Sequence, residues 1–336
     1  MRAAVTVTLR QSVLLVWFVV ASLGADARRP DLAIIEKAAG FVGFYTLDGL
    51  RVASVRVGSF PHEGVLSPDG RLLYVTENGV LWMTDEGDGG NTVAVVDVQA
   101  MKRIGLIDLG RFRRPHGISL DAASGRLFVT TEKPHGLLAV DATARKVLRD
   151  YDIQGESPHM VTSGPDSEWA FVSNTDTNAV AAVHVATGRV KLIPTGQRPQ
   201  GSALAPDGAR LYVVNSESKS ISIIDTRTQT GVGTIPIGAG AGRIAITPDG
   251  KTLVYNLQVD LGVGFADVAT RRQIAFISLG GRPLSLTMSR DGQLAFSSVQ
   301  DQDTAFVISV AGRKIIRKFQ LPKGAGPDPV IPLAAR

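Results

Sequence analysis

The sequence contains no cysteine. Disulfide bonds, thiolate nucleophiles and cysteine-ligated metal sites are therefore excluded. Aromatic residues make up only 6% of the chain, and its 36 Lys and Arg residues exceed its 31 Asp and Glu residues without gathering in a dense basic run. We interpret this small excess as a bias of the surface, and we expect no nucleic-acid partner.

Long apolar runs are also missing, apart from Val13–Leu23, which follows two arginines and precedes Ala25-Asp26-Ala27. A basic start, a short apolar run and an Ala-x-Ala site predict a secretory signal peptide over residues 1–27. The run is shorter than the ~20 residues that a membrane-spanning helix needs. We therefore expect residues 28–336 to form one mature domain, periplasmic or secreted, with no membrane attachment after cleavage. An uncleaved membrane anchor is the alternative.

A repeated turn is what the sequence has in abundance. Pro-Asp-Gly or a close relative recurs, and its last residue falls at positions 70, 125, 167, 208, 250 and 292. The intervals of 55, 42, 41, 42 and 42 residues give a period near 42 with one enlarged unit. Pro at the second position and Gly at the fourth position of these turns favour β-hairpins.

Each unit also contains short β-branched runs, such as Arg210–Asn215, Ser220–Asp225 and Gly233–Gly238. Four antiparallel strands per ~40–45 residues is the period of a β-propeller blade. Residues 31–59 match the last three strands of one more blade, and residues 326–334 match its first strand. We therefore predict an all-β, seven-bladed propeller closed by both chain ends. The alternative, an open six-bladed array, would leave unpaired edge strands.

Several strands share a four-residue pattern, in Tyr212-Val213-Val214-Asn215, Tyr74-Val75-Thr76-Glu77 and Phe171-Val172-Ser173-Asn174. With the Pro-Asp-Gly turns, this pattern resembles the YVTN-repeat β-propeller family, which includes YncE-like periplasmic proteins. The resemblance covers nearly all of the expected mature chain. It implies a propeller fold and an exported protein, and it implies no particular chemistry because the motif residues build blades.

Function on a symmetric scaffold is expected where the repeated units differ. When the units are aligned on their turns, the first strand of each begins with a residue of variable type: His62, His116, His159, Gln200, Gly242, Leu284 and Asp328. Asp328, the three histidines and Gln200 then form a continuous polar arc around one channel mouth. The ends of the second strands add Glu77, Glu132, Asn174 and Asn215, and His135 follows shortly after Glu132.

Two further features point to the same mouth. Arg114 and Arg198, like Arg282, lie two residues before the aligned position and would attract an anion, unless they are ordinary surface arginines. The enlarged unit carries its additional residues at 79–91, an acidic, glycine-rich stretch that includes Trp82. This insertion is either a lid or partner contact, or a solvated loop.

The histidine arc leaves several functions open. His62, His116 and His159 are candidate ligands of a divalent metal ion, and His116, His159 and Glu132 are candidate general bases. A structural role in orienting the first strands is the alternative. We therefore predict a binding scaffold for a protein partner or a small, anionic ligand, with no certain cofactor. The alternatives are a metal-assisted lactonase-type hydrolase or lyase, and a subunit of a periplasmic redox complex.

Overall fold

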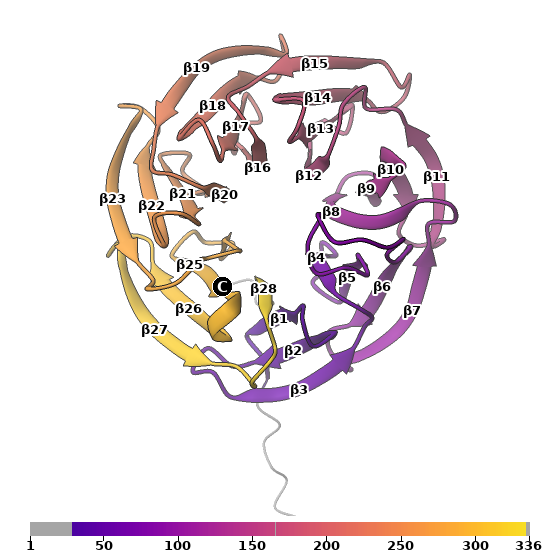
Figure 1. Cartoon of the computed structure of the whole chain (residues 1–336), viewed down its shortest axis with the longest axis vertical. Helices are drawn as coiled ribbons and strands as arrows, with labels where there is room; N and C mark the ends of the chain where they lie inside the picture. Colours follow the sequence, from indigo (N-terminus) through magenta and orange to yellow (C-terminus); the bar gives the residue numbers. More distant parts are fainter. Residues whose placement is uncertain (1–28, 165, 334–336) are drawn as a thin grey trace, which may run out of the picture.

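The computed structural model describes residues 29–164 and 166–333, and it confirms the predicted all-β, seven-bladed propeller. Seven antiparallel sheets of four strands each are arranged as a ring around a central channel (Figure 1). Within each blade the first strand lies nearest the channel and the fourth forms the outer edge. The predicted signal peptide over residues 1–27 lies outside the described residues.

Six blades each consist of four consecutive strands. The first three of these blades contain β4 (Pro61–Leu66), β5 (Leu72–Glu77), β6 (Thr92–Asp97) and β7 (Lys102–Asp108); β8 (Arg113–Asp121), β9 (Arg126–Lys133), β10 (His135–Asp141) and β11 (Lys146–Tyr151); and β12 (Pro158–Ser163), β13 (Trp169–Asn174), β14 (Ala179–His184) and β15 (Val190–Pro194). The next three contain β16 (Pro199–Leu204), β17 (Arg210–Asn215), β18 (Ser220–Asp225) and β19 (Thr230–Pro236); β20 (Ala241–Ile246), β21 (Thr252–Leu257), β22 (Gly262–Asp267) and β23 (Arg272–Ser278); and β24 (Thr287–Met288), β25 (Leu294–Val299), β26 (Thr304–Ser309) and β27 (Lys314–Gln320).

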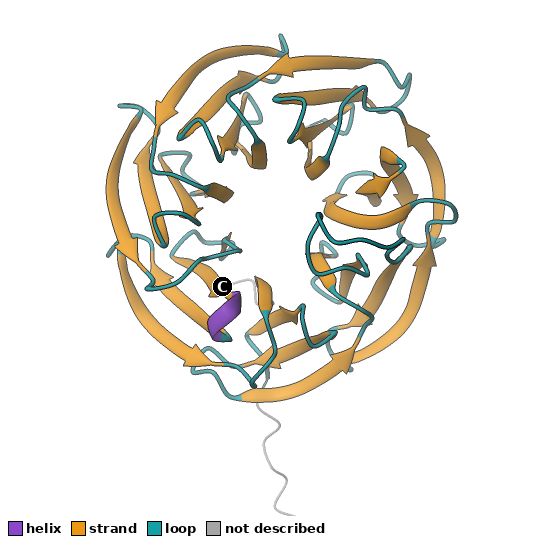
Figure 2. Cartoon of the chain, viewed as in Figure 1, coloured by secondary structure: helices purple, strands orange, loops and turns teal. Residues whose placement is uncertain are grey.

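The seventh blade joins the two ends of the chain. It contains β28 (Pro327–Pro332), β1 (Leu32–Glu36), β2 (Phe41–Tyr45) and β3 (Arg51–Arg56). β28 pairs antiparallel with β1, with Leu32 opposite Pro332 and Ala33 opposite Ile331. This pairing confirms the predicted closure and excludes the open six-bladed array. Within the described part of the chain, the one helix is a single 3-10 turn, η1 (Gln300–Gln302) (Figure 2).

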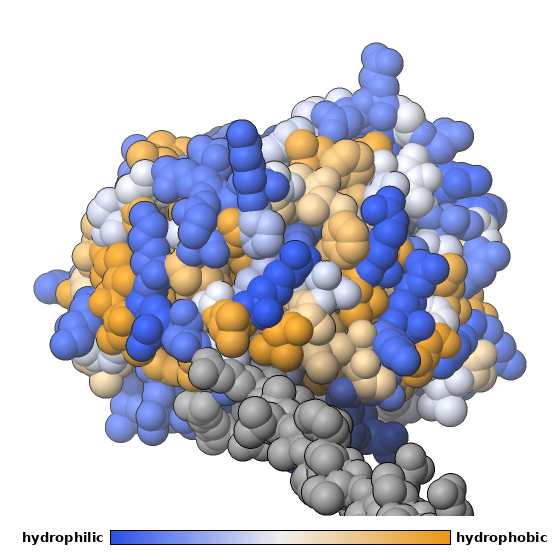
Figure 3. Space-filling model, turned by 90° about the horizontal axis from the view of Figure 1, so that it is seen from below, coloured by the Kyte–Doolittle hydropathy of each residue, from blue (hydrophilic) through white to orange (hydrophobic). Residues whose placement is uncertain are grey.

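The core lies between neighbouring blades. Ile221 and Ile235 of one blade pack in a buried cluster with Leu253 and Tyr255 of the next. The outer strands are largely exposed, and the edge of the disc is a mosaic of hydrophobic and hydrophilic residues (Figure 3). Burial of apolar side chains between blades therefore stabilises the ring. No helix in the described residues has the length and hydrophobicity to span a membrane.

A β-bulge near the start of the first strand positions the channel residues. In β4, Pro61 lies opposite Glu77, and the next register pair is Gly64 opposite Val75, so two residues of β4 face one of β5. The first strands of four other blades have the same register shift. Because a bulge redirects side chains locally, two successive residues per blade can reach the channel. His62 and Glu63 occupy this position in β4, and Gly242 and Arg243 occupy it in β20.

Candidate ligand site at one channel mouth

A cavity of about 450 Å³ occupies the channel mouth that carries the starts of the first strands. We call it the mouth cavity. Its lining includes Lys37, Asn78, Gln200, Ser216 and Leu284, together with the residues described below. Arg243, another lining residue, reaches from β20 to β4, and its Nε lies 3.0 Å from Glu63 Oε1. The side chains of two non-adjacent blades therefore meet across the channel.

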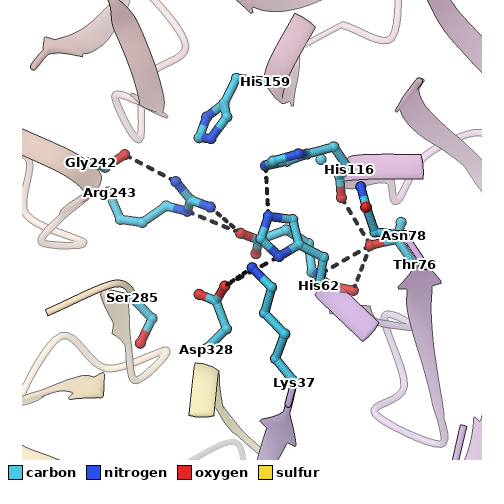
Figure 4. A network of polar contacts seen from close by, with 12 residues as sticks. Lys37, His62, Thr76, Asn78, His116, His159, Gly242, Arg243, Ser285 and Asp328 are labelled. Carbon is cyan, nitrogen blue, oxygen red and sulfur yellow. Dashed lines mark hydrogen bonds and ion pairs between the residues drawn. The ribbon is translucent and has the colours of Figure 1, made fainter. Parts of the chain in front are cut away.

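Two histidines meet in the mouth cavity. His62 Nε2 lies 2.9 Å from His116 Nε2, although the residues belong to different blades (Figure 4). The His159 ring is next to this pair, with its centroid 4.4 Å from that of His116. Gly117 allows the close approach of β8 to β12, because a Cβ at this position would lie only 2.4 Å from the His159 carbonyl oxygen.

A carboxylate lies near the outer nitrogen of each paired histidine. His116 Nδ1 lies 2.9 Å from Glu132 Oε1, and His62 Nδ1 lies 3.3 Å from Asp328 Oδ2. The same Asp328 oxygen lies 3.2 Å from Lys37 Nζ. These contacts form one continuous series, which runs from Glu132 through His116, His62 and Asp328 to Lys37.

Burial sets the protonation of the histidines. Desolvation lowers the pKa of His62 to about 4, with a further contribution from the positive charge of Lys37. Desolvation also holds the pKa values of His116 and His159 well below the ordinary value. The three imidazoles are therefore neutral near pH 7 and available as bases or metal ligands.

Burial and neighbouring charges also shift the pKa values of three carboxyl groups at this end of the channel. Burial alone would raise the pKa of Asp328, but Lys37 and His62 outweigh burial and hold it below its usual value. Desolvation raises the pKa of Glu132 despite its hydrogen bond from Asn78. Desolvation also raises the pKa of Glu63 against the opposing charge of Arg243. Asp328 is therefore the carboxylate that most strongly favours the ionised form.

The insertion at residues 79–91, which we call the lid loop, forms one wall of the mouth cavity. Arg114 anchors it: Nη1 donates to the Met83 carbonyl at 3.1 Å, and Nη2 donates to the Gly87 carbonyl at 2.7 Å. Trp82 reaches the opposite side, with Lys37 Nζ at 5.3 Å and Arg282 Cζ at 5.6 Å from its ring centroid. Contacts at Trp82, Met83 and Gly87 therefore hold the lid loop against the residues around the mouth cavity.

Most of the predicted arc does come together. His62, His116, His159, Glu132 and Asp328 all line the mouth cavity. Two further predicted residues, Gln200 and Arg198, also line it. Arg198 is half-exposed and forms ion pairs with carboxylates on its own side of the mouth, Asp176 and Glu217. Arg114, which was also predicted at this mouth, holds the lid loop and lies 3.5 Å from Glu132 Oε2.

Other predicted residues lie elsewhere. Asn215 Nδ2 donates to Ser222 Oγ at 3.0 Å, Glu77 accepts from Thr92, and the Asn174 amide lies against Gly155. His135 is exposed at the start of β10. None of these four residues lines the mouth cavity. Three of them occupy the ends of second strands, and their side chains have contacts outside the mouth cavity.

A difference of one residue in strand register explains why Glu132 lines the mouth cavity and Glu77 does not. Glu77 lies opposite Pro61, whereas the corresponding Pro115 lies opposite Thr131. Glu132 is therefore one residue further along its strand, and successive residues of a strand point to opposite faces. In four of the other blades the residue that follows the end of the second strand, namely Lys37, Asn78, Ser216 or Gln258, lines the mouth cavity as Glu132 does.

Sequence reasoning also missed Glu63 and Arg243. Only one residue per first strand was considered, whereas the bulge brings two residues to the channel. The position after each aligned residue was the signal that could have found them. In sequence order, this position holds Glu63, Gly117, Met160, Gly201 and Arg243. The acidic and the basic member of this set form an ion pair across the channel, and Arg243 also lines the mouth cavity.

Three kinds of chemistry are compatible with this arrangement. The basic side chains can bind an anion, the neutral imidazoles can accept a proton, and nitrogen ligands can bind a transition metal. Across residues 29–164 and 166–333, no three His, Asp or Glu side chains are grouped as a complete metal site. The metal ion predicted at His62, His116 and His159 therefore stays a prediction.

The fold and the mouth cavity define a class of protein, a seven-bladed propeller with a pocket at one mouth of its channel. A family model described as YNCE-like beta-propeller matches residues 91–288, more than half of the chain. The chain therefore belongs to the YncE-like β-propeller family, as the resemblance in its repeats indicated. No protein of curated function matches the chain in sequence.

Solved structures similar to the chain share the fold at low identity. A hydrazine synthase of Kuenenia stuttgartiensis is 16% identical over 77% of this chain and 86% of that chain, with a TM-score of 0.66. The dihydro-heme d1 dehydrogenase NirN is 15% identical over 92% of this chain and 76% of that chain, with a TM-score of 0.65. A functionally unknown protein from Desulfotomaculum acetoxidans is 14% identical over 90% of this chain and 98% of that chain, with a TM-score of 0.75.

Proposed function

We propose that this propeller is a binding protein that holds a small anionic ligand in the mouth cavity. The observation that carries the proposal is the charge of the lining, which contains four basic side chains, Lys37, Arg198, Arg243 and Arg282, and two carboxylates, Glu132 and Asp328. Partly enclosed cationic groups bind carboxylates and phosphates more strongly than solvated ones do, because less water competes. A cavity of about 450 Å³ has room for a small organic acid.

Arg282 is the side chain best placed to meet the ligand first. Its Nη2 donates to the neutral Gln258 Oε1 at 2.9 Å, and its guanidinium lies over the Trp82 ring. The side chain is exposed at the rim of the cavity. Its positive charge is therefore directed to the rim without a carboxylate among these contacts.

Ligand screening by thermal shift, followed by calorimetry, tests the proposal. Mono- and dicarboxylates, sugar acids and inorganic phosphate form the panel, and a true ligand raises the unfolding temperature by mass action. We expect Arg282→Gln to weaken its binding about tenfold or more, as loss of a charge-assisted contact does. Arg317→Gln, on the exposed outer strand β27, is the matched control. A panel without any stabilising anion, or equal binding by Arg282→Gln, would contradict the proposal.

A second candidate function is metal-assisted hydrolysis of an ester or lactone. It is favoured by one observation, the approach of two neutral imidazoles to 2.9 Å inside a cavity of substrate size. A metal ion held there would polarise a carbonyl group or activate water. Hydrolysis of a lactone panel by the wild type with added Zn²⁺, and its loss in His116→Ala, would favour this function over binding alone.

We also propose that the protein acts outside the cytoplasm, in the periplasm or as a secreted protein. The support is the sequence pattern of residues 1–27, with its basic start, short apolar run and Ala-x-Ala site. N-terminal sequencing of the protein from a cell-fractionation experiment should give a start at Arg28. A retained N-terminus in a membrane fraction would favour the uncleaved anchor.

A further inference from the structure

The contact between His62 and His116 has an unusual protonation requirement. Their Nε2 atoms are 2.9 Å apart, and the ring planes are inclined at 88° (Figure 4). Both side chains are buried, with only 8% of His62 and 1% of His116 exposed. Both rings also line the mouth cavity, so the pair lies at the boundary between the protein interior and the cavity.

The outer contacts favour binding through Nε2, by a hydrogen bond at His116 and by an electrostatic contact at His62. Glu132 Oε1 lies 2.9 Å from His116 Nδ1, whereas Asp328 Oδ2 lies 3.3 Å from His62 Nδ1 without hydrogen-bond geometry. When a carboxylate accepts the Nδ1 proton of an imidazole, the lone pair of the neutral ring is at Nε2. This carboxylate–imidazole arrangement is the one that orients histidine ligands in metal proteins.

Two nitrogen lone pairs cannot face each other at hydrogen-bond distance without an electropositive group between them. That group is either a proton or a metal ion. Two nitrogens at about 2.05 Å from one metal ion are separated by about 2.9 Å at the right angle of tetragonal Cu²⁺ or Ni²⁺ coordination, and by about 3.3 Å at the tetrahedral angle of Zn²⁺. The observed Nε2–Nε2 distance of 2.9 Å fits the tetragonal geometry as well as it fits a shared proton.

We propose that His62 and His116 bind one transition-metal ion through their Nε2 atoms, with Asp328 and Glu132 as the outer carboxylates that orient them. Neutral imidazole suits Zn²⁺, Cu²⁺ and Ni²⁺, and the affinity is expected to be highest for Cu²⁺. The two histidines form a half-site, consistent with the absence of a complete three-residue group in the described ranges. The remaining positions are open to water or to the proposed anionic ligand, and only this last step rests on the proposed function.

His159 and Lys37 influence which kind of metal ion the half-site can bind. The His159 ring, with its centroid 4.4 Å from that of His116, lies beside the half-site. Lys37 neutralises Asp328 through a contact of 3.2 Å, so this carboxylate is already paired and serves to orient His62. A borderline ion with nitrogen ligands is therefore favoured over Ca²⁺ or Mg²⁺, which require several oxygen ligands.

Metal titration of the full chain, without a histidine tag and after chelator treatment, tests this proposal. Calorimetry with Zn²⁺ and with Cu²⁺ should show one ion bound per chain. We expect His62→Ala and His116→Ala each to weaken binding by 100-fold or more, and Glu132→Gln to weaken it about 10- to 100-fold. His135→Ala, which removes an exposed imidazole, is the control and should bind as the wild type does.

A second measurement does not depend on the stability of the variants. The electron paramagnetic resonance spectrum of the wild type with one equivalent of Cu²⁺ should show hyperfine coupling to at least two imidazole nitrogens. No tight binding by the wild type, or unchanged affinity in folded His116→Ala, would overturn the metal site and leave a shared proton between the rings. Anion binding by the metal-free protein is measured separately, so the failure of one proposal is distinguishable from the failure of the other.

Discussion

The two faces of the propeller use the same repeat in different ways. On the turn face, Asp249 accepts hydrogen bonds from Thr247 Oγ1 at 2.6 Å and from Lys251 N at 3.0 Å, all within one turn. On the opposite face, His62 contacts His116 and Asp328, which belong to two other blades. Repeated polar residues therefore stabilise their own hairpin, whereas the non-repeated residues have partners that only the closed ring supplies.

Breaking the buried ion pair between Glu63 and Arg243 should have the largest effect. Glu63→Ala leaves the buried Arg243 guanidinium without its carboxylate, and unpairing a buried ion pair costs about 3–5 kcal/mol. Urea denaturation measures the free energy of unfolding. The double variant Glu63→Leu with Arg243→Met should recover most of the loss, because no unpaired charge remains. A single-variant cost below about 1 kcal/mol would show that water solvates this pair.

The second-largest effect is expected from acid, which should lower the free energy of unfolding by protonating His62 in the mouth cavity. The pKa of His62 is about 4 when folded. It is about 6.5 in an unfolded chain. Because the unfolded state binds more protons between these values, stability falls as the pH drops below about 6.5, and the loss is complete below about 4. His62 alone accounts for ~3 kcal/mol of this loss.

Denaturation midpoints of chelator-treated protein at pH 7 and pH 4.5 measure this loss. His62→Asn should reduce the difference between the two midpoints, because the titrating group is removed. His135→Ala should leave the difference unchanged, since this histidine is exposed. An equal pH dependence in His62→Asn and in the wild type would contradict the assignment.

The smallest effect is expected on the turn face. Asp249→Ala removes two hydrogen bonds within one exposed turn, and the five other turns of the repeat remain. We expect a smaller shift of the denaturation midpoint than in either experiment above, and unchanged anion and metal binding. A change in ligand affinity in this variant would mean that the two faces are coupled through the blade.

The repeat predicted the fold because its signals are local. A Pro-Asp-Gly turn and two flanking β-branched strands form a hairpin from fewer than twenty neighbouring residues, whichever blade contains them. The partial blades at residues 31–59 and 326–334, with three strands and one strand, were recognised by the same local patterns. The pairing of β1 with β28 confirms that they form one blade. The count of blades therefore followed from the sequence.

The residues of the mouth cavity were predicted less completely than the fold. The reason is that a register shift of one residue moves every side chain of a strand to the opposite face of the sheet. Gly70 precedes Leu73 by three residues, whereas Gly125 precedes the corresponding Leu127 by two. Alignment on the turn glycines therefore selected Glu132 at a different register from Glu77. The same alignment overlooked Lys37 and Asn78, which line the mouth cavity.

The sequence by itself determined the hairpins, the number of blades and the presence of an unrepeated polar arc, since each depends on residues close together in the chain. Tertiary structure alone decided that Glu63 meets Arg243 from 180 positions away and that His62 meets His116 between Asp328 and Glu132. The physical reason is that these contacts depend on ring closure and on bulge geometry, which turn particular side chains toward one axis.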